Sequence, residues 1–248
     1  MSVWLQDCSW RELDEQRQAA KNVVIIPVGS TEQHGNHLPL GTDTMVAMLL
    51  AEDAAKETGV VVAPPLWFGW SPHHMVLPEI LVELLYDVIQ SLHAHGFRKF
   101  IAINGHRIVN ISWMQLAAER AQRQLGVKVV LFDPAYMSKE LIGLLDYGPV
   151  GHSEEIETSQ ILYKRPELVH LEKAVDNPVV PHELYSVDPC FTGDTLCYVP
   201  STAADQKKAV ELAGGTTGSP TKSCPEKGKV YHEYLVANLV KVIRQLQK

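Results

Sequence analysis

The sequence has 248 residues, of which 46% are hydrophobic, and a formal net charge of −7 at pH 7. A chain of this size can bury one large core, so we expect a single domain spanning residues 1–248. The acidic balance excludes nucleic acid as an expected partner, and no apolar run approaches the roughly 18 residues of a membrane span. The four cysteines form no C-x-x-C pair and the first residues lack the pattern of a secretory signal, which favours a cytoplasmic protein with reduced thiols.

Apolar runs and helical periodicities alternate along the first half of the chain. Residues 9–20 fit a helix with Ser9 and Glu12 as a capping box, and the apolar run Val23–Val28 predicts a buried strand. The same patterns predict further helices over 42–57, 80–96 and 110–125, and further strands over 60–63, 99–103 and 127–132. Strands that alternate with helices indicate a mostly parallel sheet covered on both faces, a three-layer α/β/α sandwich.

The periodicity is weaker after Asp133. Residues 154–164 predict a helix that Pro166 ends, and residues 226–247 predict a closing amphipathic helix. The stretch 175–220 is rich in Pro, Gly and Asp and predicts irregular loops and edge strands. We find no internal repeat and no linker that would divide the chain.

The loop after Val23–Val28 carries four side chains that can bind metals. Glu32, His34, His37 and Asp43 lie within twelve residues of sequence. Glu32 and His34 are two residues apart, so in an extended segment they project to the same side. Asp43 has two carboxylate oxygens and could bridge two ions. We expect His37 in an outer or surface position instead, because a turn separates it from His34 and ligating histidines need outer partners.

Two further ligands are expected later in the chain. His106 follows the predicted strand 99–103, and sites in parallel sheets lie beyond the carboxyl ends of strands. Glu157 lies just inside the predicted helix 154–164, with Glu154 and Glu155 as competing carboxylates. The negative charges of three carboxylates and one hydroxide would neutralise the positive charges of two divalent cations. The cations would lower the pKa of the bridging water to roughly 7 and make it a nucleophile.

These motifs resemble one protein family. The segments GSTEQHGNHLPLGTD, NGH and H-x-x-E-x-E-T-S, in this order, are similar to those of the creatininase (creatinine amidohydrolase) family, as is the later GTTGSPTKSCPEKGK. The resemblance covers most of the chain. It implies a three-layer α/β fold, a small-molecule substrate, a homo-oligomer that is usually a hexamer, and two divalent ions, zinc with manganese often at one site.

The resemblance also assigns roles to residues. His152 resembles the family's catalytic histidine, which would shuttle a proton to the leaving group. A metal-bridging hydroxide would attack a carbonyl of a small cyclic substrate. The predicted ligands divide between the two metals, with Glu32 and His106 on one, His34 and Glu157 on the other, and Asp43 bridging both.

The chain departs from creatinine-hydrolysing members in the predicted pocket. Those members follow NGH with Tyr-Glu-Asn, whereas here Arg107 follows His106, the Glu is absent and the turn is one residue longer. They also place Trp in two pocket segments, which correspond here to 133–137 and 147–150 and contain none. Leu77-Pro78 also runs straight into Glu79, so either a substrate loop that family members usually have here is absent or the sequence omits a stretch. A creatinine ring held between two indoles is therefore not expected.

Substrate contacts are expected from Arg107, Tyr136, His73 and His74, which suit a hydroxylated or anionic molecule. We therefore favour ring opening of an oxidised inositol, a dehydro-inosose, by C–C hydrolysis, as in inositol catabolism. The alternatives are C–N hydrolysis of a cyclic amide or formamide and, from another class, a non-catalytic metal-binding scaffold. A dinucleotide-dependent oxidoreductase is a weaker alternative, because no G-x-G-x-x-G follows any predicted strand.

Overall fold

The computed structural model describes residues 2–71, 76–178, 186–187, 198–199 and 202–248. The chain divides into two compact units. Unit 1 comprises Met1–Thr31, Asp43–Met137 and Tyr234–Lys248, and unit 2 comprises Glu32–Thr42 and Ser138–Glu233. Each unit is therefore assembled from segments that are distant in the sequence. The single domain that composition predicts stays a prediction.

Unit 1 is built on a parallel sheet. Its strands are β1 (Val23–Val28), β2 (Val61–Val62), β3 (Lys99–Asn104) and β4 (Lys128–Phe132), in the order β2-β1-β3-β4. Every pairing between neighbours is parallel. The carboxyl ends of the strands therefore meet at one edge of the sheet, where the sequence predicts the functional residues.

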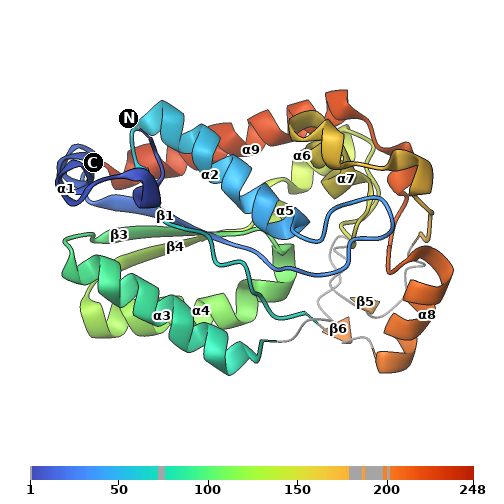
Figure 1. The fold of residues 1–248 in the computed structure, drawn as a ribbon, viewed down its shortest axis with the longest axis horizontal. Helices are drawn as coiled ribbons and strands as arrows, with labels where there is room; N and C mark the ends of the chain where they lie inside the picture. Colours follow the sequence, from blue (N-terminus) through green and yellow to red (C-terminus); the bar gives the residue numbers. More distant parts are fainter. Residues whose placement is uncertain (1, 72–75, 179–185, 188–197, 200–201) are drawn as a thin grey trace. The chain divides into compact units, whose positions relative to one another are not determined.

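Helices cover both faces of this sheet (Figure 1). In unit 1, α3 (Pro78–Ala94) and α4 (Ile111–Leu125) lie on one face. The opposite face is covered by α2 (Thr42–Thr58) and by the C-terminal half of α9 (Pro225–Leu246). All six residues of β1 are buried, as expected of a strand with helices on both sides. The predicted three-layer α/β/α arrangement is confirmed.

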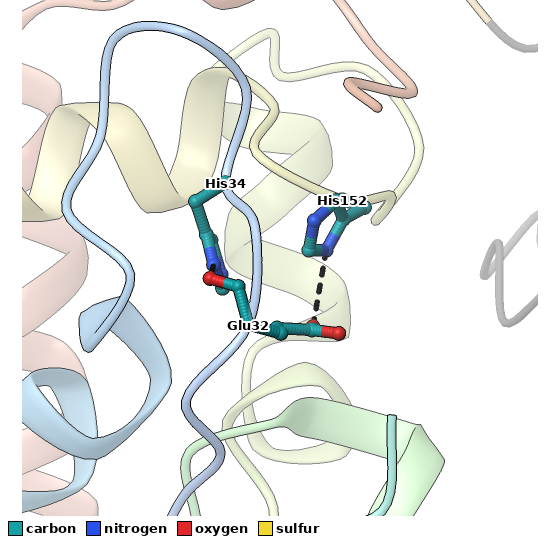
Figure 2. A group of neighbouring side chains, drawn as sticks. All are labelled: Glu32, His34 and His152. Atoms are coloured by element: carbon teal, nitrogen blue, oxygen red, sulfur yellow. Dashed lines mark hydrogen bonds and ion pairs between the residues drawn. The ribbon is translucent and has the colours of Figure 1, made fainter. Parts of the chain in front are cut away.

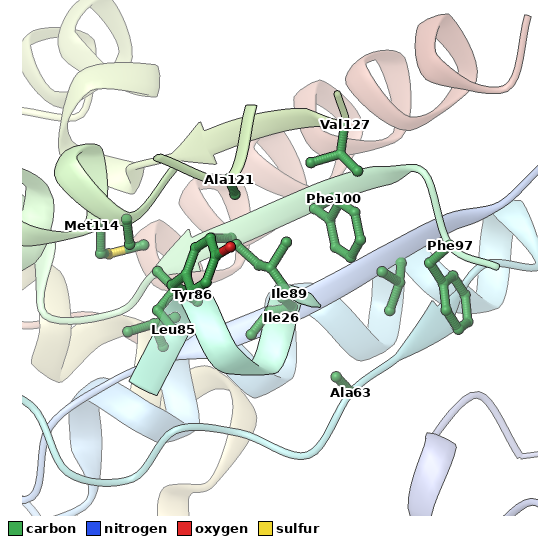
Figure 3. Packing of buried hydrophobic residues seen from close by; sticks show 14 of the residues in the cluster. Ile26, Ala63, Leu85, Tyr86, Ile89, Phe97, Phe100, Met114, Ala121 and Val127 are labelled. Atoms are coloured by element: carbon green, nitrogen blue, oxygen red, sulfur yellow. The ribbon is translucent and has the colours of Figure 1, made fainter. Parts of the chain in front are cut away.

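The core between the sheet and the α3–α4 layer is apolar (Figure 3). Ile26 of β1 and Phe100 of β3 are fully buried and belong to one cluster with Leu85 and Ile89 of α3 and Met114 of α4. Full burial of each such side chain stabilises the fold by about 1.5–3 kcal/mol. This packing holds the strand ends in place for the residues that follow them.

The remaining elements include one clear correction. The prediction of irregular structure over 175–220 is wrong for α8 (Ala203–Ala213), which begins after a capping box of Thr202 and Asp205 and ends at Gly214 in the left-handed conformation. The capping box and the glycine are local signals for a helix, and the prediction gave more weight to the Pro, Gly and Asp content of the whole stretch. Within the same stretch, β5 (Ser186–Val187) and β6 (Tyr198–Val199) form a small parallel sheet.

The predicted capping box of Ser9 and Glu12 is present at the start of α1. No helix in the described ranges is long and apolar enough to cross a membrane. The α-helices not yet named are α1 (Trp10–Ala19), α5 (Pro134–Met137), α6 (Lys139–Leu144) and α7 (Glu155–Lys164), and the 3-10 helices are η1 (Leu5–Asp7), η2 (Arg107–Asn110), η3 (Pro166–Leu168), η4 (Leu171–Lys173) and η5 (Pro220–Lys222).

Candidate functional site

Polar side chains link two strand ends at the carboxyl edge of the unit 1 sheet. Asn104 ends β3, and its Nδ2 donates to Oδ2 of Asp133, which follows β4, across 2.8 Å. The other oxygen of Asp133 accepts from the backbone N–H of Ala135 at 2.9 Å. Burial raises the pKa of Asp133. The hydrogen bonds from Asn104 and the backbone, and the charge of Arg107, lower it by less. The two strand ends are thus joined by a buried hydrogen bond.

Asp43 and His106 are the two predicted metal ligands in unit 1. Asp43 lies in the first turn of α2 and His106 follows β3, and their exposed fractions are 1% and 7%. His106 Nδ1 lies 2.7 Å from Asp43 Oδ2, which is a hydrogen-bond distance. Two ligands bonded to one tetrahedral ion at about 2.1 Å would lie about 3.4 Å apart. An ion shared by these two atoms would therefore move them apart.

Two glycines allow this part of the site to form. A Cβ on Gly105 would lie 1.9 Å from the carbonyl oxygen of Asp43. A Cβ on Gly29, which follows β1, would lie 2.2 Å from Oγ1 of Thr44. Glycine is therefore required where the ends of β1 and β3 approach the first turn of α2.

Glu32, His34 and His152 lie together in unit 2 (Figure 2). One ligand atom of each lies within 4.8 Å of the others, so the three could hold a metal ion. Glu32 and His34 are 2% and 0% exposed. His152 Nδ1 lies 3.5 Å from Glu32 Oε1, and the ring centroids of His34 and His152 are 4.5 Å apart. A carboxylate with two imidazoles is a donor set that suits zinc or manganese.

Hydrogen bonds to backbone carbonyls assign the tautomers of both histidines. His34 Nδ1 donates to the carbonyl oxygen of Glu32 at 3.3 Å, which leaves the lone pair on Nε2. His152 Nε2 donates to the carbonyl oxygen of Gln33 at 2.6 Å, which leaves the lone pair of the neutral ring on Nδ1. These lone-pair atoms lie 3.7 Å from Glu157 Oε2 and 3.5 Å from Glu32 Oε1. Both distances are close to the separation of about 3.4 Å between two ligands of one tetrahedral ion, so the donor atoms fit a bound cation.

The structure distinguishes the three carboxylates at the start of α7. Glu157 is 5% exposed and faces His34, and its Oε2 also accepts from the backbone N–H of Ser153 at 2.8 Å. Glu154 is the N-cap residue of the helix and is buried. Both oxygens of Glu155 accept hydrogen bonds from backbone N–H groups. Glu157 is therefore the carboxylate of the three that has the position expected of a ligand.

His37 lies beside α7 in a buried position. It is 1% exposed, and its Nε2 is 2.9 Å from Oγ1 of Thr158. Burial, followed by the charge of His34, lowers the pKa of His37 to about 4. His37 is therefore neutral at pH 7, and the alternative of a surface position is wrong.

Two of the four predicted substrate residues can be placed. Arg107 is 5% exposed directly after His106, whereas Tyr136 on α5 is 47% exposed. His73 and His74 lie outside the described residues. Arg107 and Ile108 have φ of 27° and 25°, so the longer turn after His106 runs through two successive left-handed residues. Each costs about 1–2 kcal/mol relative to a right-handed conformation.

Gln33 and Thr217 bond to His152, and the sequence did not reveal either contact. Gln33 supplies the carbonyl oxygen that fixes the ring of His152. Thr217 pairs with the backbone of His152, since His152 N–H donates to Thr217 Oγ1 at 2.8 Å and Thr217 N–H donates to His152 O at 2.9 Å. The Gly-rich segment around Thr217 was the available signal, but its partner in space is 65 residues away.

Comparison with known proteins identifies the family. The family model for creatininase, described as creatinine amidohydrolase, matches residues 6–243. The chain belongs to the creatininase family. It is 28% identical to the 3-dehydro-scyllo-inosose hydrolase of Thermotoga maritima, over 99% of this chain and 84% of the relative. It is 26% identical to the creatinine amidohydrolase of Pseudomonas putida, over 98% of this chain and 97% of the relative.

Solved creatininases agree with this family assignment. A mutant creatininase of Zn–Zn type superposes with a TM-score of 0.80 at 26% identity, covering 99% of this chain and 98% of that one. A manganese form superposes with a TM-score of 0.77 at 25% identity and the same coverage. The protein is thus a metal-dependent hydrolase with the creatininase fold, and the scaffold alternative is not retained.

Proposed function

We propose that this creatininase-family hydrolase opens the ring of an oxidised inositol, a dehydro-inosose, by C–C hydrolysis. The observation that carries the substrate class is the buried Arg107 directly after His106. A guanidinium has five N–H donors and no acceptor, so it suits the many hydroxyl and carbonyl oxygens of an oxidised polyol. The similarity to the 3-dehydro-scyllo-inosose hydrolase of Thermotoga maritima supports the same class.

The proposal includes two divalent cations, zinc or manganese, and their ligands. When bound, such cations lower the pKa of water to near 7 and polarise a carbonyl group. The distance between His34 Nε2 and Glu157 Oε2 in unit 2 and the buried Asp43–His106 pair in unit 1 support these donors separately. Assigning both sets to one centre follows the family resemblance. The proposed ligands are Glu32, His34, Asp43, His106 and Glu157.

His152 is the proposed proton shuttle. Its Nε2–H bond to Gln33 leaves Nδ1 as the atom that gains and loses a proton. After water adds to one carbonyl of a cyclic diketone, the adjacent ring C–C bond breaks and its electron pair passes to the second carbonyl as an enolate. The proton that His152 Nδ1 took from the adding water then goes to the enolate carbon, and the hydrated carbonyl loses its remaining proton to become a carboxylate. One water is consumed and one C–H bond is formed.

C–N hydrolysis of a creatinine-type amide is the second candidate, because the similarity to creatinine amidohydrolase extends over nearly the whole of both chains. The segments 133–137 and 147–150 contain no Trp to sandwich that ring. A Cβ on Gly148 would also lie 2.5 Å from Glu155 Oε1, so a larger residue there would displace that carboxylate. These features favour the polyol over creatinine.

The experiment is a substrate panel with metal analysis on the purified protein. We expect turnover of a dehydro-inosose, with little turnover of creatinine or a formamide. Arg107→Met should raise KM for the dehydro-inosose about tenfold or more by removing charged hydrogen bonds. His152→Ala should lower kcat with metal content retained, and metal loss in that variant would contradict the shuttle role. Turnover of creatinine without dehydro-inosose activity would overturn the proposed substrate.

A further inference from the structure

Glu155 is a buried carboxylate that joins two segments of unit 2. It is 4% exposed, its Oε1 accepts from the backbone N–H of Gly148 at 2.8 Å, and its Oε2 accepts from that of Ser219 at 2.9 Å. Gly148 lies four residues before His152, and Ser219 lies two residues after Thr217. Both segments that hold His152 are therefore attached to one side chain.

His152 depends on these two segments for its position. Its backbone pairs with that of Thr217 through His152 N–H and Thr217 N–H, and its ring is held by the carbonyl oxygen of Gln33. The next residue, Ser153, has a φ of 54°, a left-handed conformation that persists only when its surroundings hold it. A small shift of either segment would therefore move the imidazole.

We propose that Glu155 is a positioning residue that keeps His152 in place for proton transfer, an inference that rests on the proposed role of His152. Two backbone N–H groups need two acceptor atoms, and a carboxylate supplies both. A glutamine would turn its NH₂ group toward one of them. Gly148 leaves room for the Glu155 carboxylate, because a Cβ at this position would lie 2.5 Å from Glu155 Oε1. Glu155 thus acts through His152.

The decisive variant is Glu155→Gln, alone and combined with His152→Ala. Glu155→Gln should lower kcat roughly tenfold to a hundredfold, the usual cost of losing a supporting hydrogen bond, with KM and metal content unchanged. In the His152→Ala background it should lower kcat less than about twofold, because its effect passes through the missing imidazole. If the two substitutions lower kcat by factors that multiply in the double variant, the inference is overturned. Loss of metal from the Glu155→Gln variant would overturn it as well.

Gly148→Ala is a second variant that keeps Glu155 but crowds Oε1. Gly148→Ala should lower kcat less than Glu155→Gln does, and this effect should also disappear in the His152→Ala background. Wild-type kcat in both Glu155→Gln and Gly148→Ala would overturn the inference. Asp205→Asn is the matched control. The Asp205 carboxylate likewise accepts from a backbone N–H, that of Thr202 at 2.9 Å, and from the Thr202 Oγ1 at 2.7 Å, but both residues lie at the start of α8 and not in the segments around Gly148 and Thr217. Its kcat should remain that of the wild type.

Amide hydrogen exchange separates this inference from the proposed function. Glu155→Gln should speed exchange in peptides that contain Gly148 and Ser219, whereas Asp205→Asn should speed it only near Thr202. Unchanged exchange at Gly148 and Ser219 would overturn the positioning role whatever the substrate. Full kcat in His152→Ala would instead overturn the proposed proton shuttle, and the positioning role with it.

Discussion

Three histidines of unit 2 have different chemistry because their surroundings differ. His34 and His152 each donate one ring N–H to a backbone carbonyl and turn the other nitrogen toward a carboxylate. His37 is paired with the hydroxyl of Thr158 and has its pKa lowered to about 4, chiefly by burial. The first two are therefore suited to bind a cation or carry a proton, whereas His37 is suited to stay neutral.

His37→Gln should weaken the pH dependence of stability in acid. The pKa of His37 is about 4 in the folded protein and about 6.5 in an unfolded chain, so between these values the unfolded state binds more protons. Its contribution to stability is present above pH 6.5 and is lost as pH falls toward 4, on the order of 3 kcal/mol in total. Urea unfolding of chelator-treated protein between pH 7.5 and 4.5 measures this loss.

His170→Gln is the control for that series. His170 belongs to the same unit, but its side chain is exposed. The His170 variant should keep the slope of the wild type between pH 6.5 and 4.5. A His37→Gln variant with the wild-type slope would contradict the prediction.

In unit 1, Gly105, which follows β3, lies close to the first turn of α2 at Asp43. Gly105→Ala should destabilise the protein by about 2–3 kcal/mol, because the added methyl group forces β3 and α2 apart. The variant should also bind metal more weakly, since the shift separates His106 from Asp43. Urea unfolding and metal analysis measure the two effects.

Gly143→Ala is the matched control, because a Cβ at that position meets no atom within 4 Å. Gly143 lies within α6, where alanine is the better helix former, so this variant should be neutral or slightly more stable. Equal stability of the two alanine variants would show that the approach at Gly105 is not close enough to matter.

Divalent cations held by the proposed ligands should stabilise the folded protein. Removal of metal by a chelator should lower Tm by about 5–10 °C, because metal at a hundred times its Kd adds about 2.7 kcal/mol to the folded state. Returning zinc should restore the original Tm. The shift is measured by calorimetry with and without added zinc.

Single variants test the proposed ligands in each unit. His106→Asn in unit 1 and His34→Asn in unit 2 should each reduce the stabilisation by zinc. A variant that keeps the full stabilisation would contradict the ligand role of its histidine.

Local sequence signals predicted most of the fold and the family. The uninterrupted apolar run Val23–Val28 is a buried strand, and Ser9 with Glu12 caps α1. Hydrophobic periodicity and capping act over a few residues, which is why a sequence displays them directly. The same kind of signal was present for α8 in Thr202 and Asp205, and the surrounding Pro and Gly residues obscured it.

The roles of individual polar residues depended on partners that are distant in the sequence. Glu154, Glu155 and Glu157 are the same residue type and lie close together in the sequence. Only the residues that contact them in the folded chain distinguish them. Glu157 faces His34 across 3.7 Å, whereas Glu155 accepts from the backbone of Gly148 and Ser219. Hydrogen bonding is short in range and directional, so tertiary folding decides which carboxylate faces a histidine and which one supports the backbone.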